Sequence, residues 1–339
     1  MAFPTTTRAF RRTSDGHSIE LVSEPVPQKL QPTEVLLKIH AVSLNFRDVG
    51  MLHGRYPIPV IPHGIPCSDA SATIISVGSS VTEFAEGDSV APTFRETRSG
   101  EIQALGGDVD GVLREYAIFD QCDITKVPNY LTREEASTIP CAGVTAWTAL
   151  DFDKKKQGKS ALMQGTGGVS IFATLLCIAA GMAAIITSSS DEKLEKCKEL
   201  GQGVQGVNYR TNQDWDQEAK KLTQGKGVDV VINNIGITSM EQCFSALARY
   251  GTISLVGFLG GVDEAKMPDC FTPVLMKAAR VQGIFVGTRE DQQDLCAFLA
   301  EKKIDLKPLV DRVFSFEESA DAFEYLYSGA HTGKVVITI

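Results

Sequence analysis

The chain has 339 residues, enough for one large or two medium-sized domains, and 43% of them are hydrophobic, enough for extensive buried cores. The formal net charge of −9 argues against nucleic acid as the main partner, because a phosphate backbone selects basic surfaces. No apolar run approaches the roughly 20 residues of a membrane-spanning helix, so we expect neither nucleic acid nor a membrane as a partner.

The eight cysteines are scattered along the chain, and none forms a Cys-x-x-Cys pair. This distribution is typical of reduced, buried thiols and favours a cytoplasmic location. The N-terminal stretch up to Arg12 also contains Arg8 and Arg11 but no acidic residue, so a mitochondrial leader is an alternative. We favour a first strand at residues 7–10.

The first part of the chain, up to about residue 125, is predicted to consist of short strands separated by turns. Expected strands cover residues 7–10, 34–43, 72–78 and 111–118, with a turn and a short strand within 86–92. Short strands at this spacing predict a small β-barrel.

From about residue 130 the pattern changes to alternating strands and helices, which predicts a parallel sheet. The expected strands are 160–164, 183–188, 204–208, 228–233, 251–257 and 281–286, and the expected helices are 169–180, 191–200, 214–223, 239–248 and 272–279. Six such strands match the doubly wound dinucleotide-binding fold, an α/β architecture. The tail adds helices at 290–301 and 317–326 and a strand at 333–339.

A glycine-rich turn joins the strand 160–164 to the following helix. Its sequence is Gly165-Thr166-Gly167-Gly168-Val169-Ser170. Glycines at such a turn let the backbone approach a pyrophosphate, and the helix N-terminus offers free N–H groups to the phosphates. We therefore expect Gly165, Thr166, Gly167, Gly168 and Val169 to bind a dinucleotide.

The end of the next strand indicates which dinucleotide fits. NAD-selective folds place an acidic residue there, whereas this strand ends in Ser188-Ser189-Ser190, followed by Lys193 in the next helix. Hydroxyls and a lysine suit a 2′-phosphate, and Tyr209 and Arg210 could close the adenine side, so NADPH is expected over NADH. The alternative is that Ser190 only caps the helix; both roles are compatible.

The chain resembles the medium-chain dehydrogenase/reductase superfamily over nearly its whole length. The matching segments are 42–48, 66–70, 77–78, 87–90, 142–147, 165–170 and 333–336. The resemblance implies a GroES-like catalytic β-barrel domain from residues 1–127 and 293–339, and a Rossmann NADP-binding domain from 128–292. Ser170 stands where the family pattern has glycine, and a small residue is still expected to fit.

The resemblance also bears on zinc. In zinc-containing members, a cysteine, a histidine and a second cysteine hold the catalytic metal, and here Asn45, Ser68 and Cys141 occupy those positions. Catalytic zinc needs about three protein ligands, so one thiolate cannot hold it. Residues 93–115 also lack the cysteines of the structural zinc lobe. We expect a zinc-independent protein.

The zinc-free branch includes quinone reductases, enoyl-thioester reductases and alcohol-dehydrogenase-like proteins. Hydride addition to a simple ketone builds an alkoxide that needs strong stabilisation, whereas an activated C=C bond or a quinone needs less. The favoured function is an NADPH-dependent reductase of an α,β-unsaturated carbonyl compound or a quinone. Two alternatives remain: a metal-free alcohol dehydrogenase or biosynthetic oxidoreductase on a ring substrate, and a non-catalytic nucleotide-binding protein.

The segment 45–56 is similar to the part of mitochondrial enoyl-thioester reductases that ends in their acid tyrosine, which predicts Tyr56 as proton donor. The alternative is a loop tyrosine that only packs. Asn45 is expected to contact the nicotinamide or the substrate. Further expected cofactor contacts are Thr145, Gly236, Phe258, Phe285, Val286 and Lys334, and a homodimer is expected through the strand at 281–286.

Overall fold

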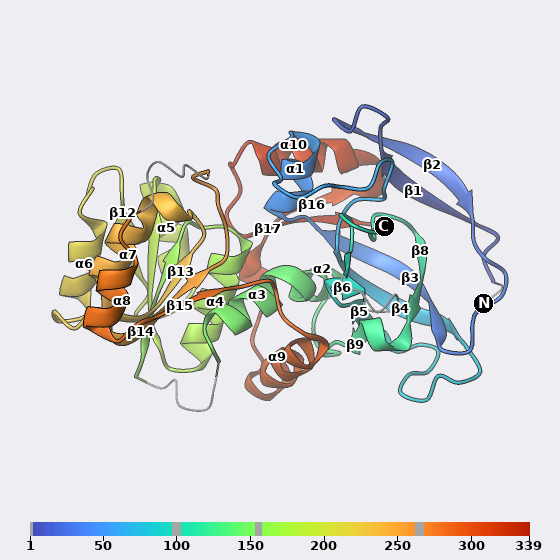
Figure 1. Ribbon diagram of the computed structural model, residues 1–339. Helices are drawn as coiled ribbons and strands as arrows, with labels where there is room; N and C mark the ends of the chain where they lie inside the picture. The colour runs from blue at the N-terminus through green and yellow to red at the C-terminus, as the bar shows by residue number, and fades with distance from the viewer. Residues whose placement is uncertain (1–2, 97–102, 153–157, 262–267) are drawn as a thin grey trace. The chain divides into compact units, whose positions relative to one another are not determined.

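The computed structural model describes residues 3–96, 103–152, 158–261 and 268–339 (Figure 1). The chain divides into two compact units. The terminal unit contains Met1–Val144 and Gly287–Ile339, and the central unit contains Thr145–Val286. The domain limits suggested by the family resemblance, at 127/128 and 292/293, stay a prediction.

The terminal unit is built around a seven-stranded sheet that joins both ends of the chain. Its strands are β16 (Val310–Ser315), β17 (Lys334–Thr338), β3 (Glu34–Ser43), β4 (Asp69–Val77), β5 (Ser89–Pro92) and β9 (Ile124–Lys126) in spatial order, and β8 (Tyr116–Asp120) also pairs with β3. The C-terminal strand β17 runs antiparallel to β3, with Ile337 opposite Val42. This pairing places Lys334, at the start of β17, near the end of β3.

Short elements complete the terminal unit. These are the hairpins β1 (Thr6–Arg12) with β2 (Ile19–Pro25) and β6 (Arg95–Glu96) with β7 (Gln103–Ala104), the helices α1 (Phe46–Leu52), α2 (Arg133–Ser137), α9 (Arg289–Lys302) and α10 (Ser319–Tyr327), and a π-helix, η2, at Ile139–Gly143. Strand β3 is buried along most of its length and supplies much of the core. The helix α1 directly follows it.

The expected strand at 111–118 is partly wrong, because β8 begins only at Tyr116. The backbone of residues 111–113 instead bonds to the segment 65–67: the N–H of Gly111 donates to Ile65 O at 2.7 Å, and that of Val112 to Cys67 O at 3.0 Å. A Cβ atom on Gly111 would lie 2.0 Å from Cys67 O. Glycine therefore permits this approach of backbone to backbone, which positions the turn before β4.

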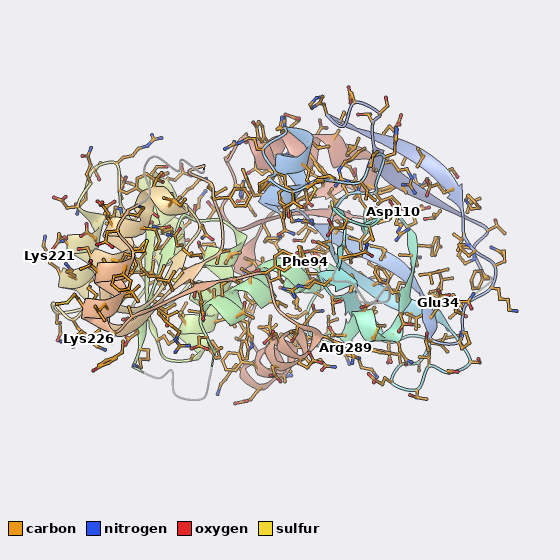
Figure 2. All side chains as sticks on the ribbon, in the orientation of Figure 1. Glu34, Phe94, Asp110, Lys221, Lys226 and Arg289 are labelled. Carbon is orange, nitrogen blue, oxygen red and sulfur yellow. The ribbon has the colours of Figure 1, made fainter. Side chains whose placement is uncertain are left out.

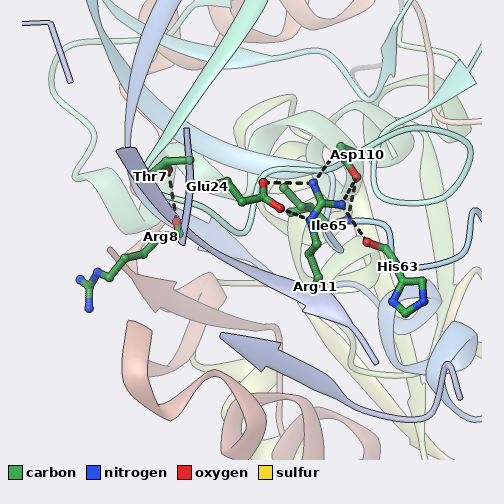
Figure 3. Close-up of polar contacts among 7 residues, drawn as sticks. All are labelled: Thr7, Arg8, Arg11, Glu24, His63, Ile65 and Asp110. Carbon is green, nitrogen blue, oxygen red and sulfur yellow. Dashed lines mark hydrogen bonds and ion pairs between the residues drawn. The ribbon is translucent and has the colours of Figure 1, made fainter. Parts of the chain in front are cut away.

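Arg11 on β1 fixes the same turn from the other side (Figure 3). Its guanidinium donates to both carboxylate oxygens of Glu24 on β2, to both of Asp110, and to the carbonyl oxygen of His63. Asp110 in turn accepts the N–H of Ile65 at 2.9 Å. Charge-assisted hydrogen bonds of this kind are among the stronger polar contacts in proteins, so the turn at 63–67 is firmly held.

The central unit is a parallel six-stranded sheet with helices between its strands (Figure 1). In spatial order the strands are β12 (Gln205–Asn208), β11 (Ala183–Ser188), β10 (Ser160–Gln164), β13 (Val228–Asn233), β14 (Leu247–Leu255) and β15 (Arg280–Gly283). The helices are α3 (Val144–Ala149), which begins one residue before the unit, α4 (Gly168–Ala179), α5 (Asp191–Lys198), α6 (Trp215–Leu222), α7 (Met240–Ala246) and α8 (Phe271–Lys277). This order confirms the doubly wound fold.

The largest differences from the predicted strand limits in the central unit are at β14 and β15. Strand β14 begins at Leu247, four residues early, because Leu247 pairs with Val228 through an irregular register. Strand β15 ends at Gly283 rather than at residue 286, and Val286 has a φ angle of 56°. A β-branched residue in the left-handed region cannot continue a strand. Leu162, Ile185, Val231 and Ile253 form the core of the sheet with residues of α6 and α7.

Candidate functional site

The glycine-rich turn has the geometry that a phosphate-binding turn needs. Gly165 has a φ angle of 81°, which favours glycine, and Gly167 precedes α4 in an extended conformation. A Cβ atom on either glycine would meet no atom within 4 Å, so open space lies beside both. Helix α4 then begins with Gly168, and its first N–H groups can bind an anion.

Ser170, which replaces a glycine of the family pattern, fits because its hydroxyl is fully used. Its Oγ donates to the carbonyl oxygen of Gln164 at 3.0 Å and accepts from the side-chain amide of Asn234 at 3.1 Å. Asn234 follows β13, so the serine joins the turn after β10 to the turn after the adjacent strand. The substitution therefore adds a contact and does not crowd the helix–strand junction.

The carboxyl ends of the parallel strands bring most predicted cofactor residues to one edge of the central sheet. Gly165, Thr166, Gly167, Gly168 and Val169 follow β10, Ser188 and Ser189 end β11, Tyr209 follows β12, Gly236 follows β13, Phe258 follows β14, and Phe285 and Val286 follow β15. This is the edge at which ligands bind in doubly wound sheets. Thr145 lies on α3, and Lys334 and Asn45 belong to the terminal unit.

The end of β11 and the residues after it carry the hydroxyls predicted to bind the 2′-phosphate. Ser188 Oγ accepts the N–H of Ser190, and Ser190 Oγ caps α5 by accepting the N–H of Lys193 at 3.3 Å. The nearby carboxylate of Asp191 accepts a hydrogen bond from the Asn208 side chain at 2.7 Å. The cap predicted as the alternative role of Ser190 is confirmed, and the acid nearest the strand end is held by Asn208.

Buried amides shape the turn after β13, where Gly236 lies. The Asn233 side chain accepts the N–H of Gly236 at 2.6 Å and donates to its carbonyl oxygen at 3.3 Å. The Gln164 side chain accepts the N–H of Ile235 at 3.3 Å. Gly236 has a φ angle of 96°, and a Cβ there would lie 3.3 Å from Gly257 O. Two side chains thus fix a turn that only glycine adopts easily.

The remaining predicted residues of the central unit differ in exposure. Thr145 is buried, Phe258 is half-buried, and Phe285 is 51% exposed. Val286 is buried, and its carbonyl oxygen accepts a hydrogen bond from the Thr148 hydroxyl at 2.5 Å. Since Thr148 lies on α3, this bond ties the segment after β15 to the beginning of the central unit.

A second cluster lies at the end of β3 in the terminal unit and includes the three positions that hold zinc in other members of the superfamily. Lys334 Nζ donates to Leu44 O at 2.6 Å and to Asn45 Oδ1 at 2.7 Å, and lies 3.8 Å from Asp69 Oδ2. Asp69 accepts from the Ser68 hydroxyl at 2.6 Å. Lys334 is only 2% exposed, so its ammonium lies inside the unit and has protein partners.

The π-helix η2 connects Cys141 to this cluster. Pro140 lacks an N–H group, and the wide turn leaves the N–H of Cys141 free to donate to Asp69 Oδ2 at 3.2 Å. Such π-helical turns occur frequently at functional sites. Burial raises the pKa of the Cys141 thiol to about 12, so the group is a neutral thiol at physiological pH. Burial also raises the pKa of Asp69, while Lys334 acts in the opposite direction.

Tyr56, the predicted proton donor, is half-buried just beyond α1 and has a cationic neighbour. The guanidinium carbon of Arg47 lies 5.5 Å from the centre of the Tyr56 ring and 4.9 Å from that of Phe94, which is labelled in Figure 2. Arg47 Nη1 donates to Leu105 O at 2.8 Å. A guanidinium over an aromatic face is attracted by the ring, so Arg47 helps to hold Tyr56.

Arg47 and its neighbour Asp48 have separate hydrogen-bond partners. The Asp48 carboxylate accepts the N–H of Asn45 at 2.8 Å and closes a capping box at the start of α1. Burial lowers the pKa of Arg47, but Asp48 and Tyr56 outweigh it, so the pKa is raised overall. The sequence did not indicate that Arg47 would lie against Tyr56, because the fold of residues 53–61 after α1 decides it.

Known proteins resemble this chain throughout. Residues 31–129 match the alcohol dehydrogenase GroES-like domain and residues 168–301 the zinc-binding dehydrogenase family. A zinc-type alcohol dehydrogenase-like protein of Schizosaccharomyces pombe is 40% identical over 327 residues and 93% of each chain. The chain belongs to the medium-chain dehydrogenase/reductase superfamily. It is an oxidoreductase of this type, which confirms the predicted superfamily and fold class.

Two further members show the same breadth of similarity. An alcohol dehydrogenase of Geobacillus stearothermophilus is 30% identical over 333 residues, which cover 94% of this chain and 96% of its own. The crystal structure of an NAD-dependent alcohol dehydrogenase has a TM-score of 0.85 and 28% identity, and it covers 98% of this chain and 99% of its own. In the described ranges, no helix is both long and apolar enough to cross a bilayer.

Zinc, which the matched family's description implies, does not suit the residues at the end of β3. An amide at 45 and a hydroxyl at 68 leave Cys141 as the single cysteine, histidine or carboxylate among the three positions, whereas catalytic zinc needs about three such ligands. Among the described residues, no group of three or more His, Cys, Asp or Glu side chains could hold a metal ion. We therefore derive no catalytic step through zinc.

Proposed function

We propose that this oxidoreductase is a zinc-independent, NADPH-dependent reductase of activated C=C bonds or quinones. The observation that carries the proposal is the cluster at Asn45, Ser68 and Cys141, which offers one thiol, too few ligands for catalytic zinc, and is joined to Asp69 and Lys334 by hydrogen bonds. An enolate or a phenolate forms more easily than a simple alkoxide and can be stabilised by hydrogen-bond donors alone. When bound, NADPH would supply the hydride.

In this proposal, the edge of the central sheet binds the dinucleotide. The turn at Gly165–Val169 takes the pyrophosphate, and Ser188, Ser189 and Lys193 take the 2′-phosphate. Support comes from the open space beside Gly165 and Gly167 and from the engagement of Asp191 with Asn208. One relative is described as NAD-dependent, so the preference needs a direct test.

The cofactor test compares dissociation constants for NADPH and NADH, measured by fluorescence. Ser189→Glu places a carboxylate where the phosphate is expected, and it should weaken NADPH binding at least about tenfold while NADH binding changes little. Glu192→Gln, which removes a carboxylate on the exposed side of α5, is the control. Tighter binding of NADH by the unaltered protein would refute the NADPH preference.

Tyr56 is proposed as the proton donor to the product carbon or enolate, and Asn45 as a hydrogen-bond donor to the ligand. The Arg47 guanidinium against the phenol ring supports a fixed position for Tyr56. Tyr56→Phe should lower kcat by about tenfold or more without changing the dissociation constant of NADPH. Tyr327→Phe is the matched control on α10. Unchanged kcat of the Tyr56→Phe enzyme would remove Tyr56 from the mechanism.

The substrate class is tested by following NADPH oxidation with a panel of quinones, enones, enoyl thioesters, ketones and aldehydes. The proposal predicts a higher kcat/KM with quinones or conjugated carbonyl compounds than with simple ketones and aldehydes. The names of two relatives, both alcohol dehydrogenases, favour the second candidate, a metal-free alcohol dehydrogenase. Fastest turnover of simple aldehydes would decide for that candidate, and NADPH binding without turnover would favour a non-catalytic role.

We also propose a homodimer formed through the edge of the central sheet. Strand β15 is an edge strand, and the neighbouring α8 presents Phe271, Leu275 and Met276 at 77%, 66% and 69% exposure. An uncovered strand edge beside an apolar surface is an aggregation hazard unless a second copy covers it. Light scattering should give twice the monomer mass, and Leu275→Glu should shift the protein toward monomer.

A cytoplasmic location is proposed from the cysteines. Among the described residues, which include all eight cysteines, no two form a disulfide, as is usual in reducing compartments. Fractionation of cells that express a tagged chain tests this: recovery with mitochondria would favour the leader at the arginine-containing N-terminus.

A further inference from the structure

Lys334 has an unusual environment for a lysine: it is buried at the start of β17 and surrounded by polar atoms from other segments. Its Nζ has Leu44 O and Asn45 Oδ1 within hydrogen-bond distance and the Asp69 carboxylate at 3.8 Å. Asp69 is itself fully buried. Removing an ammonium group from water is unfavourable, so a buried lysine needs polar partners that compensate for the lost hydration. The partners of Lys334 therefore indicate which groups it stabilises.

The contact with Asn45 fixes the orientation of the carboxamide. An ammonium group can only donate, so the side-chain oxygen of Asn45 must face Lys334 and the NH2 group must face away. Asp69 favours the same orientation, since the Asn45 amide is one of the groups that counteract the burial-raised pKa of the Asp69 carboxyl. A flipped amide would point its NH2 at the ammonium and its oxygen toward the carboxylate.

The fixed orientation leaves a donor without a full set of partners. Asn45 Nδ2 is buried, and apart from the attraction of one of its hydrogens to the Asp69 carboxylate it has no hydrogen-bond partner among the described residues, so its second hydrogen is left for a ligand. A buried donor left in this state costs free energy unless a ligand or another group satisfies it. The backbone around it is also held, because the N–H of Asn45 donates to Asp48 and Leu44 O accepts from Lys334.

We infer that Lys334 is a positioning residue that holds the Asn45 carboxamide so that its NH2 group donates to an oxygen of the bound ligand. The inference rests on the proposed function, in which Asn45 contacts the ligand. It assigns Lys334 an indirect role, whereas the sequence predicted a direct contact of Lys334 with the cofactor. The class of ligand atom is a carbonyl oxygen that gains negative charge, or the nicotinamide carboxamide oxygen.

The test must separate this role from simple pairing of Lys334 with Asp69. Lys334→Met alone leaves the Asp69 charge buried without its cation, and such a variant can fail to fold. The double variant Lys334→Met/Asp69→Asn removes both charges and keeps side chains of similar size and shape. We therefore expect its Tm to lie within a few degrees of the Tm of the unaltered enzyme. Lys159→Met, which removes the exposed lysine of the Lys159–Asp229 pair at 3.2 Å, is the control for a lost lysine–aspartate contact.

Two readouts decide the outcome: a crystal structure of the double variant, and kcat, KM and the NADPH dissociation constant. We expect a displaced or flipped Asn45 amide and a kcat at least about tenfold lower, with fluorescence-measured NADPH binding within about twofold. Lys159→Met should leave all three constants unchanged.

An Asn45 amide that keeps its position in the double variant would overturn the inference, whatever happens to kcat. A displaced amide with unchanged kcat would overturn it as well, because the orientation would then not matter. If the unaltered enzyme turns over none of the substrates, the proposed function fails, and the crystal structure still decides whether Lys334 positions Asn45.

Discussion

His40, in the middle of β3, is expected to make the stability of the terminal unit depend on pH. Its side chain is 9% exposed, and Nε2 lies 2.8 Å from the hydroxyl oxygen of Thr73 on the adjacent strand β4. Burial, followed by the positive charges of Arg133 and Lys38, lowers the pKa of His40 from 6.5 to about 4. The folded protein therefore holds a neutral imidazole where the unfolded chain holds one that titrates normally.

The sign and size of the effect follow from this difference. As the pH falls below about 6.5, His40 becomes protonated in the unfolded chain but stays neutral in the folded protein. Protonation therefore stabilises the unfolded state relative to the folded state. The free energy of unfolding continues to fall until about pH 4, where folded His40 also becomes protonated, and this contribution is complete below that value. A difference of about 2.5 pKa units corresponds to about 3 kcal/mol, a large part of the stability of a typical domain.

The variant His40→Gln isolates this contribution, because glutamine can reach Thr73 with a polar group but does not titrate in this range. Urea unfolding of both proteins at several pH values between about 7.5 and 4 gives the difference in free energy of unfolding. We expect the unaltered protein to lose about 3 kcal/mol relative to the variant over this range. A difference that stays constant with pH would refute the reasoning, and so would an imidazole that titrates near pH 6.5 by NMR.

Three further predictions concern backbone and charge. Gly111→Ala should destabilise the protein by about 3 kcal/mol or more in urea unfolding, since the new Cβ would lie 2.0 Å from Cys67 O; a loss below about 1 kcal/mol would contradict the backbone contact. Gly165→Ala should lower the free energy of unfolding by about 1–2 kcal/mol, because alanine is strained at the Gly165 φ of 81°. Gly167→Ala should lower it less, because the φ of Gly167 is −81°. Equal decreases for the two variants would contradict this reasoning. Burial raises the pKa of Asp110, but the Arg11 hydrogen bond outweighs it and the net pKa is lowered. Its contribution is present above the unfolded pKa of about 4 and lost as the pH falls through the folded value, so the stability gap to Asp110→Asn should be widest near neutral pH and close in acid.

Hydrophobic periodicity was sufficient to predict the central unit. Each strand there is a short apolar run between helices, and a parallel sheet with both faces covered needs little more than that alternation. The turn at Gly165 could be predicted for the same reason, because its glycines, the preceding strand and the following helix are adjacent in sequence. The end of β11 at Ser188 matches the predicted strand limit, because the apolar run stops where the three serines begin.

The terminal unit was predicted less completely, because contacts between distant segments decide its local structure. Residues 111–113 have the composition of a strand but bond to the turn at 65–67, a partner that the local sequence does not specify. The π-helix at Ile139–Gly143 contacts the Asp69 carboxylate, a residue 72 positions away in the sequence, which accepts the N–H of Cys141. Neither feature has a periodic signal.

The candidate site likewise has features that the sequence predicted and features that only the tertiary structure decided. The sequence by itself determined which residue types stand at the zinc positions, and hence that Asn45, Ser68 and Cys141 supply one amide, one hydroxyl and one thiol. Only the tertiary structure decided what these groups do, because the pairing of β17 with β3 brings Lys334 to Asn45 across 289 residues of sequence. The chemical type of a side chain follows from the sequence at that position. The orientation of a donor such as the Asn45 amide depends on the charged group that the fold places beside it.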